Sequence, residues 1–182
     1  MPKREICFWT QPVGIEDWNY DLTLAATSQG VCRLGLGQTF EEEEALAVWA
    51  RRWFPDYRLV RAGQVNRRFF KEIRDYLAGR LQEFTVPLHL EGTPFQIRVW
   101  EELCRIPFGQ TRSYAFIARQ IDCPKACRAV GLANNKNPIP LLIPCHRVIG
   151  QNGSLIGYRY GLDLKVRLLQ LERAIIQKRG DK

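Results

Sequence analysis

The stretch that decides the fold and the chemistry is Asn137-Pro138-Ile139-Pro140-Leu141-Leu142-Ile143-Pro144-Cys145-His146-Arg147-Val148. Its three prolines fix the backbone φ angle and hold an apolar segment rigid ahead of a cysteine. A thiolate is a strong nucleophile near neutral pH, and a neighbouring histidine favours its formation. Cys145 is therefore the candidate nucleophile, and His146, one of two histidines in the chain, is the candidate base.

The direct succession of these two residues argues against a cysteine protease dyad. Consecutive side chains on an extended backbone point to opposite faces, so His146 is expected to reach the sulfur through a water molecule. A last helix is predicted over residues 162–176, with Lys165 and Glu172 two turns apart on one face. From there the Glu172 carboxylate could orient the imidazole, although a solvated helix glutamate is the commoner case.

Two short helices are predicted upstream, over residues 113–120 and 124–134, in the arrangement of a helix-turn-helix. Polar and small side chains are expected on opposite faces of the second helix. The polar face carries Lys125, Arg128, Leu132 and Asn135, and the small face carries Ala126, Ala129, Val130 and Ala133, extended by Gly131. A helix this narrow could enter a minor groove, with Arg128 wedged into the base stack. The alternative is that the two helices merely pack together and their basic side chains are solvated.

The charge is unevenly distributed between the two halves of the chain. Residues 1–91 carry 12 Lys/Arg and 13 Asp/Glu, whereas residues 92–182 carry 15 Lys/Arg and 6 Asp/Glu, so the net charge of +8 comes from the second half. Basic side chains release condensed counterions when they bind phosphates, which makes a polyanion a reasonable partner for that half.

Three segments together resemble the active-site signature of the O6-alkylguanine-DNA alkyltransferase family. They are Pro144-Cys145-His146-Arg147-Val148, Asn137-Pro138-Ile139-Pro140 and Arg128-Ala129-Val130-Gly131. The resemblance covers residues 92–175, while the first 90 residues match the family's N-terminal domain only in length and pattern. It implies direct DNA repair, in which an alkyl group moves irreversibly from O6 of guanine, and by extension from O4 of thymine, to Cys145 after base flipping.

The resemblance also implies roles for individual residues. Cys145 would accept the alkyl group, His146 would be its water-mediated base, and Glu172 would hold His146. Tyr114 would turn the target nucleotide outward and hydrogen-bond the base, with Lys165 near its hydroxyl.

The remaining roles concern DNA binding and the substrate pocket. Arg128 would fill the space left by the base, and Asn137 would link that helix to the active site. Tyr158 would begin a loop that closes over the base, and the Cys145 and Val148 carbonyls would accept from the guanine amino group. The other expected DNA-binding residues are Lys125, Ala126, Ala129, Gly131 and Asn135.

The sequence departs from the family at the rim of the pocket. After Tyr158 the family usually has a small residue and two glycines, but here Arg159 and Tyr160 precede Gly161. We expect Tyr160 to restrict bulky pseudo-substrates such as benzylguanine.

The fold class is expected to be α/β, with two domains. Residues 1–88 are predicted to form a small antiparallel sheet with helices, ribonuclease H-like, and residues 92–176 a mostly helical domain with the helix-turn-helix. The predicted elements of the first domain are a hairpin turning at Ser28-Gln29-Gly30 and helices over 41–54 and 67–81, followed by a break at 83–92.

The amino-acid composition limits the plausible binding partners and cellular compartment of the protein. Six cysteines without framework spacing indicate a reducing, cytoplasmic setting, and no apolar run is long enough to span a membrane.

We expect a monomer that binds double-stranded DNA through the minor groove. No convincing cofactor fingerprint is present, so damaged DNA must be the alkyl donor and no cofactor is expected. Cys7, Cys32 and His89 could ligate zinc, but without a fourth ligand no metal is expected.

Three other functions compete with this one. A non-catalytic alkyltransferase-like protein would lack the acceptor cysteine, and a regulator fused to this domain would carry a further DNA-binding module. A thiol hydrolase is disfavoured by the adjacent order of Cys145 and His146.

Overall fold

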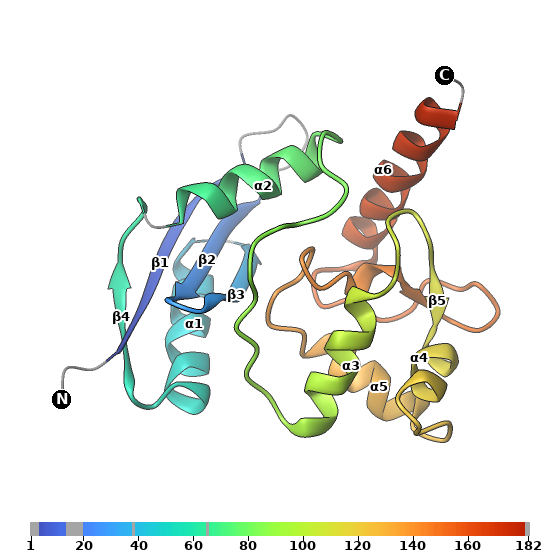
Figure 1. Ribbon diagram of the computed structural model, residues 1–182, viewed down its shortest axis with the longest axis horizontal. Coiled ribbons are helices and arrows are strands. Elements are labelled where there is room, and N and C mark those ends of the chain that lie inside the picture. The colour runs from blue at the N-terminus through green and yellow to red at the C-terminus, as the bar shows by residue number, and fades with distance from the viewer. Residues whose placement is uncertain (1–3, 14–19, 38, 65, 181–182) are drawn as a thin grey trace. The chain divides into compact units, whose positions relative to one another are not determined.

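The computed structural model describes residues 4–13, 20–37, 39–64 and 66–180 (Figure 1). The chain divides into two compact units, Met1–Glu91 and Gly92–Lys182. The first unit contains a four-stranded sheet with two helices, and the second is mostly helical. The predicted α/β class is confirmed.

The sheet of the first unit has the strand order β3-β2-β1-β4. Its strands are β1 (Arg4–Pro12), β2 (Asp21–Thr27), β3 (Gly30–Gly37) and β4 (Tyr57–Arg61). The predicted hairpin is present as the antiparallel pair of β2 and β3. The predicted antiparallel sheet needs one correction: it is mixed, because β4 pairs parallel with β1. Helix α1 (Thr39–Trp53) makes the crossover that a parallel strand requires.

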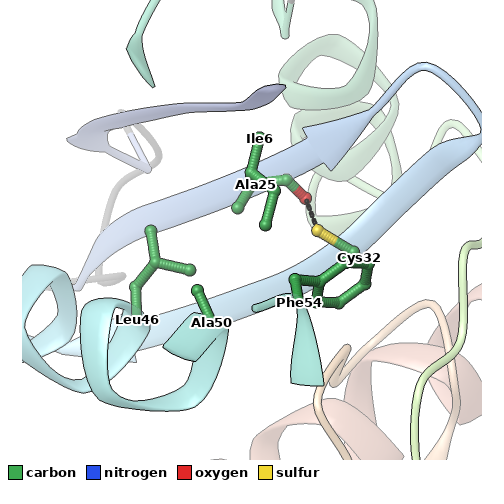
Figure 2. Packing of buried hydrophobic residues seen from close by; sticks show 6 residues of the cluster. All are labelled: Ile6, Ala25, Cys32, Leu46, Ala50 and Phe54. Atoms are coloured by element: carbon green, nitrogen blue, oxygen red, sulfur yellow. Dashed lines mark hydrogen bonds between the residues drawn. The ribbon is translucent and has the colours of Figure 1, made fainter. Parts of the chain in front are cut away.

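The two helices of this unit cover opposite faces of the sheet. Side chains alternate along β1, so Ile6 packs with Leu46 and Ala50 of α1, whereas Trp9 meets the side chains of α2 (Arg67–Leu77). Figure 2 shows the core on the α1 side, where the Cys32 thiol donates a 3.4 Å hydrogen bond to the Ala25 carbonyl. The core beneath α2 contains Phe70, Ile73, Tyr76 and Leu77.

Helix α2 ends four residues earlier than predicted. Ala78 caps it, and Gly79 follows with φ of 75°, a left-handed conformation that stops a helix at little cost to glycine. The chain then runs along the free edge of β3, where Val31 donates to the Pro87 carbonyl at 2.9 Å and His89 donates to the Val31 carbonyl at 2.8 Å. The predicted break at 83–92 is therefore irregular chain paired with the sheet edge.

The second unit begins with α3 (Pro94–Cys104), whose start has a local cause. The Thr93 hydroxyl accepts from Gln96 N at 3.3 Å, and Gln96 Oε1 accepts from Thr93 N at 2.9 Å, which makes a capping box. The indole N–H of Trp100 donates to the Ala133 carbonyl at 2.9 Å and ties α3 to α5 (Cys127–Asn135).

The two predicted short helices are present as α4 (Tyr114–Gln120) and α5. Helix α5 starts at Cys127 rather than at 124, because Asp122 adopts a left-handed φ of 57° and a turn follows it. Two short parallel strands, β5 (Arg112–Ser113) and β6 (Val148–Ile149), place the start of α4 beside the residues that follow Cys145.

The last helix, α6 (Leu162–Gly180), presents a mixed face to the unit. Leu164 and Leu168 are buried, whereas Leu171 and Ile175 are only half-buried. Lys165 and Glu172 take part in the buried face. No helix in the described ranges is long and apolar enough to cross a membrane.

Candidate active site

Cys145 lies in a tight turn rather than on extended backbone. Residues Cys145–Arg147 form a 3-10 turn, in which Cys145 N donates to the Ile143 carbonyl at 2.7 Å and Arg147 N to the Pro144 carbonyl at 2.9 Å. The expectation of an extended segment is therefore wrong, because the prolines direct the chain into a turn. Side chains of a 3-10 turn still diverge by about 120° per residue, so Cys145 and His146 point in different directions.

The Cys145 thiol is 4% exposed, and its environment keeps it protonated at neutral pH. Burial raises the pKa of Cys145 to about 11, against the opposing effect of hydrogen bonds from Asn137 and Tyr158 and of the Lys165 charge. A thiol with this pKa needs a base to take its proton at the moment of attack.

His146 and Glu172 form the buried pair that the sequence predicted. Both side chains are fully buried, and His146 Nε2 lies 2.9 Å from Glu172 Oε1. Burial would raise the pKa of Glu172, but hydrogen bonds and charge from His146 and then Arg147 hold it at about 2. Burial lowers the pKa of His146, so its ring is neutral at pH 7 and able to accept a proton.

Arg147 completes this cluster, although no role is predicted for it from the sequence. Its Nη2 and Nε donate to Glu172 Oε1 at 2.9 and 3.1 Å, and its Nη1 donates to the Ile106 carbonyl at 2.6 Å. Gly109 N donates to Glu172 Oε2 at 2.7 Å, with φ of 72° at Gly109. One signal for Arg147 was available: a basic residue inside an apolar stretch must find a carboxylate when buried.

Lys165 joins the strand after Cys145 to the loop before Tyr158. Its Nζ is fully buried and donates to the Val148 carbonyl at 2.6 Å and to the Ile156 carbonyl at 3.0 Å. The Tyr114 hydroxyl donates to the same Ile156 carbonyl at 3.1 Å, so Lys165 and Tyr114 meet through that oxygen. Burial lowers the pKa of Lys165 to about 8.

Tyr114 connects this cluster to a groove on the surface. Burial, and then the charge of Cys145, raise the pKa of Tyr114 to about 12. The groove measures about 670 Å³ and has one wall from α5 and another from the loop around residues 150–157. Its lining consists of Tyr114, Ala115, Cys127, Arg128, Gly131, Leu132, Asn135, Gly150, Gln151, Ile156 and Gly157.

The exposed face of α5 matches the predicted polar face in most positions. Arg128, Leu132 and Asn135 are exposed and line the groove, and Lys125 is exposed just ahead of the helix. The predicted small face needs correction, because only Val130 and Ala133 of its four residues are buried. Ala129 is exposed and Ala126 half-buried, since both lie outside the narrow arc of α5 that packs against the unit.

Comparison with known proteins places this site in a family. Residues 94–174 match the model of the "6-O-methylguanine DNA methyltransferase, DNA binding domain". The chain is 46% identical over 158 residues to the inducible methylated-DNA--protein-cysteine methyltransferase of Bacillus subtilis, covering 87% of this chain and 86% of that protein. The chain belongs to the methylated-DNA--protein-cysteine methyltransferase family.

Solved structures of this methyltransferase family have the same fold. The crystal structure of Mycobacterium tuberculosis O6-methylguanine methyltransferase aligns with a TM-score of 0.70 and 39% identity, over 93% of each chain. A structure of the M. tuberculosis protein in complex with DNA aligns with a TM-score of 0.69 and 39% identity, over 94% of each chain.

Asn137 holds the methyltransferase turn that precedes Cys145. Its Nδ2 donates to the Ile143 carbonyl at 2.8 Å, and its Oδ1 accepts from Ile139 N at 2.9 Å. Leu141, inside this turn, has φ of 71°, which is uncommon for a residue other than glycine. Asn134, which the sequence analysis did not select, donates to the Cys145 carbonyl at 3.4 Å. The Cys145 carbonyl accepts from Asn134 Nδ2 and from Val148 N, and the Val148 carbonyl accepts from Lys165 Nζ.

The three residues at the rim pack on one another. The Tyr158 and Tyr160 rings are 6.1 Å apart at 64°, and the Arg159 guanidinium lies 5.7 Å from the Tyr160 ring centroid. Tyr158 and Tyr160 are half-buried and Arg159 is exposed. Arg159 and Tyr160, which replace the small residues of the family pattern, are thus held in place by contacts among the three rim residues.

The zinc candidates do not come together as a ligand set. Within the described ranges, no three His, Cys, Asp or Glu side chains are placed to hold a metal ion. Cys32 donates to the Ala25 carbonyl, and His89 Nδ1 lies 2.7 Å from the Thr27 hydroxyl. Burial raises the pKa of Cys32 to about 12, which disfavours the thiolate that zinc requires.

Proposed function

We propose that this protein repairs alkylated DNA directly, by moving a methyl or larger alkyl group from O6 of guanine to Cys145 Sγ. The observation that carries the proposal is a buried, protonated thiol beside a neutral histidine and a groove bordered by a basic helix face. Family membership supports the same reaction. We further propose that the protein acts as a cytoplasmic monomer on duplex DNA and requires no cofactor.

The proton balance follows from the charge states of the site. Sγ attacks the alkyl carbon, the S–C bond forms and the C–O6 bond breaks. The thiol proton passes to His146, through a water molecule in our proposal, while Glu172 stabilises the imidazolium that forms. The guanine product gains one proton and leaves as the ordinary base, for which the Tyr114 hydroxyl is the proposed donor. The proton held by His146 then returns through solvent to the Tyr114 phenolate, so that both side chains end neutral. The thioether has no easy route back to the thiol, so each molecule reacts once.

Access to a paired base requires that the base leave the duplex, at a cost of a few kcal/mol. We propose that α5 enters the minor groove and that Arg128 occupies the space of the extruded nucleotide. The positions of Arg128 and Tyr114 in the same groove support this arrangement. Tyr114 would then exchange its hydrogen bond with the Ile156 carbonyl for one with the DNA.

The experiment incubates the purified, reduced protein with excess duplex containing O6-methylguanine and analyses its peptides by mass spectrometry. We expect one added methyl group per protein molecule, on the peptide that contains Cys145. Cys145→Ser should accept no methyl group, whereas Cys104→Ser, which removes a cysteine outside the proposed site, should react as the wild type. An unmodified Cys145 peptide would instead favour a damage-recognition protein without chemistry.

A further inference from the structure

The first unit contains a cavity of about 290 Å³ that has no part in the alkyl-acceptor site. It is bounded by the end of β1, the loop after β4 and one face of α2. The described lining residues are Trp9, Gln11, Gly63, Gln64, Arg67, Phe70 and Arg74. Arg67, Phe70 and Arg74 recur at helical spacing, so the two arginines lie on the same face of α2 as the buried Phe70 and line the cavity with it.

Arg67 and Arg74 differ from most basic side chains of this unit, because no carboxylate of the described residues forms an ion pair with them. Six others form ion pairs: Arg33, Arg58, Arg61, Arg68, Lys71 and Arg80. In the part of the chain that the structure describes, neither Arg67 nor Arg74 has an ion-pair partner, and no acidic residue is among the cavity's described lining. The cavity is therefore locally basic in a half of the chain whose net charge is −1.

The start of α2 adds to this positive field. Its first turn carries no acidic residue. The side chain of Asn66, which precedes it, donates to the Cys7 and Leu24 carbonyls and does not cap the helix. The partial positive charge of a helix N-terminus, which an acidic first turn usually offsets, is here reinforced by Arg67.

We propose that this cavity binds one nucleotide, with its phosphate between Arg67 and Arg74 and its ring against Trp9. Guanidinium groups match phosphate oxygens in bidentate geometry, and indole is a good surface for a planar base. Gln11 and the α2 face also line the site, and its volume is near the lower limit for small-ligand pockets, which suits one nucleotide rather than a larger cofactor.

Gly63 keeps the cavity wall close to Trp9. A Cβ atom at Gly63 would lie 2.8 Å from the indole ring, so a side chain there would push the ring or the loop out of place. The nucleotide could be free in solution or part of a DNA strand, and the two sources are separable by experiment.

The test titrates the full-length protein with deoxyguanosine monophosphate, inorganic phosphate and a short single-stranded oligonucleotide by calorimetry. The Trp9 indole N–H resonance reports locally on the cavity by NMR. The variant is Arg67→Gln/Arg74→Gln. Its matched control is Arg51→Gln/Arg52→Gln, which removes the same charge from exposed positions of α1.

We expect the mononucleotide to shift the Trp9 resonance and to bind about tenfold or more weakly to the Arg67/Arg74 variant, because each charge-assisted bond contributes measurably. The control variant should bind as the wild type does. If the oligonucleotide binds more tightly than the mononucleotide and this binding is lost in the Arg67/Arg74 variant, the site takes part of a DNA strand. If the oligonucleotide binds no more tightly than the mononucleotide, the site takes free nucleotide. If inorganic phosphate binds as tightly as the mononucleotide, the base ring contributes nothing to binding, and the proposed contact with Trp9 is overturned. Absence of binding, or binding unchanged in the variant, overturns the proposal.

Discussion

Arg147→Met is expected to destabilise the second unit strongly, because it leaves the Glu172 carboxylate buried without its cation. The methionine fills a similar volume but cannot donate the three bonds of 2.9 to 3.2 Å that the guanidinium gives to this carboxylate. His146 and Gly109 N would remain as the partners of Glu172.

The magnitude follows from the burial of both partners. Removing one member of a buried ion pair typically costs about 3–5 kcal/mol. The depressed pKa gives a consistent scale: a carboxyl held at about 2 instead of 4.5 contributes roughly 3 kcal/mol to folding above pH 4.5. That contribution is lost as the pH falls from 4.5 towards 2. Since Arg147 supplies part of it, the variant should also unfold at a higher pH than the wild type.

The measurement is urea unfolding followed by circular dichroism and by tryptophan fluorescence, with both signals fitted because the two units can unfold separately. Arg105→Met is the matched control. Arg105 pairs with Glu102 at 2.9 Å, but its side chain is 76% exposed, so its loss should cost less than about 1 kcal/mol. If Arg147→Met costs no more than this control, the cluster around Glu172 does not depend on its ion pair.

Four further predictions concern the reaction and DNA binding. The pH profile of the single-turnover rate of methyl transfer should have its inflection below pH 6.5, because burial lowers the pKa of His146 from its usual value. An inflection above pH 6.5 would contradict this role. Leu132→Ala should weaken duplex binding about tenfold, since it removes a 65% exposed apolar side chain from the groove, without changing the salt dependence. Lys125→Gln should reduce the slope of log K against log salt by about one, because Lys125 is expected to contact a phosphate. Equal slopes for the Leu132 and Lys125 variants would show that Lys125 makes no such contact. Tyr160→Gly should accelerate the reaction with free benzylguanine, and an unchanged rate would mean that the rim does not select substrates.

Features with short-range causes were predictable from the sequence. The start of α3 is specified locally, because Thr93, Pro94 and Gln96 carry a complete cap. The pairing of His146 with Glu172 was predictable only through the resemblance, because a glutamate on a helix is usually solvated.

Long-range partners were not predictable. β4 pairs with β1 across the α1 crossover, and no local pattern specifies that its neighbour is parallel. Glu172 collects bonds from Gly109 and Arg147 on distant segments, which only the tertiary fold brings together. The turn at Cys145 was missed because alternation was assumed in a segment whose prolines specify a turn.

The electrostatics of the site suit a protein that reacts once. With a pKa of about 11, roughly one Cys145 in ten thousand is a thiolate at pH 7, so the resting sulfur is a poor target for oxidants and stray electrophiles. An enzyme that turns over could tolerate a reactive resting thiol, but here any unwanted modification of the Cys145 sulfur inactivates the molecule permanently. The cost is a slower intrinsic attack, which the adjacent neutral His146 offsets only when a substrate carbon is in place. Burial of Cys145 and the charged cluster around His146 therefore act together. Burial keeps the sulfur protonated and unreactive, and His146 removes its proton only when a flipped base is bound.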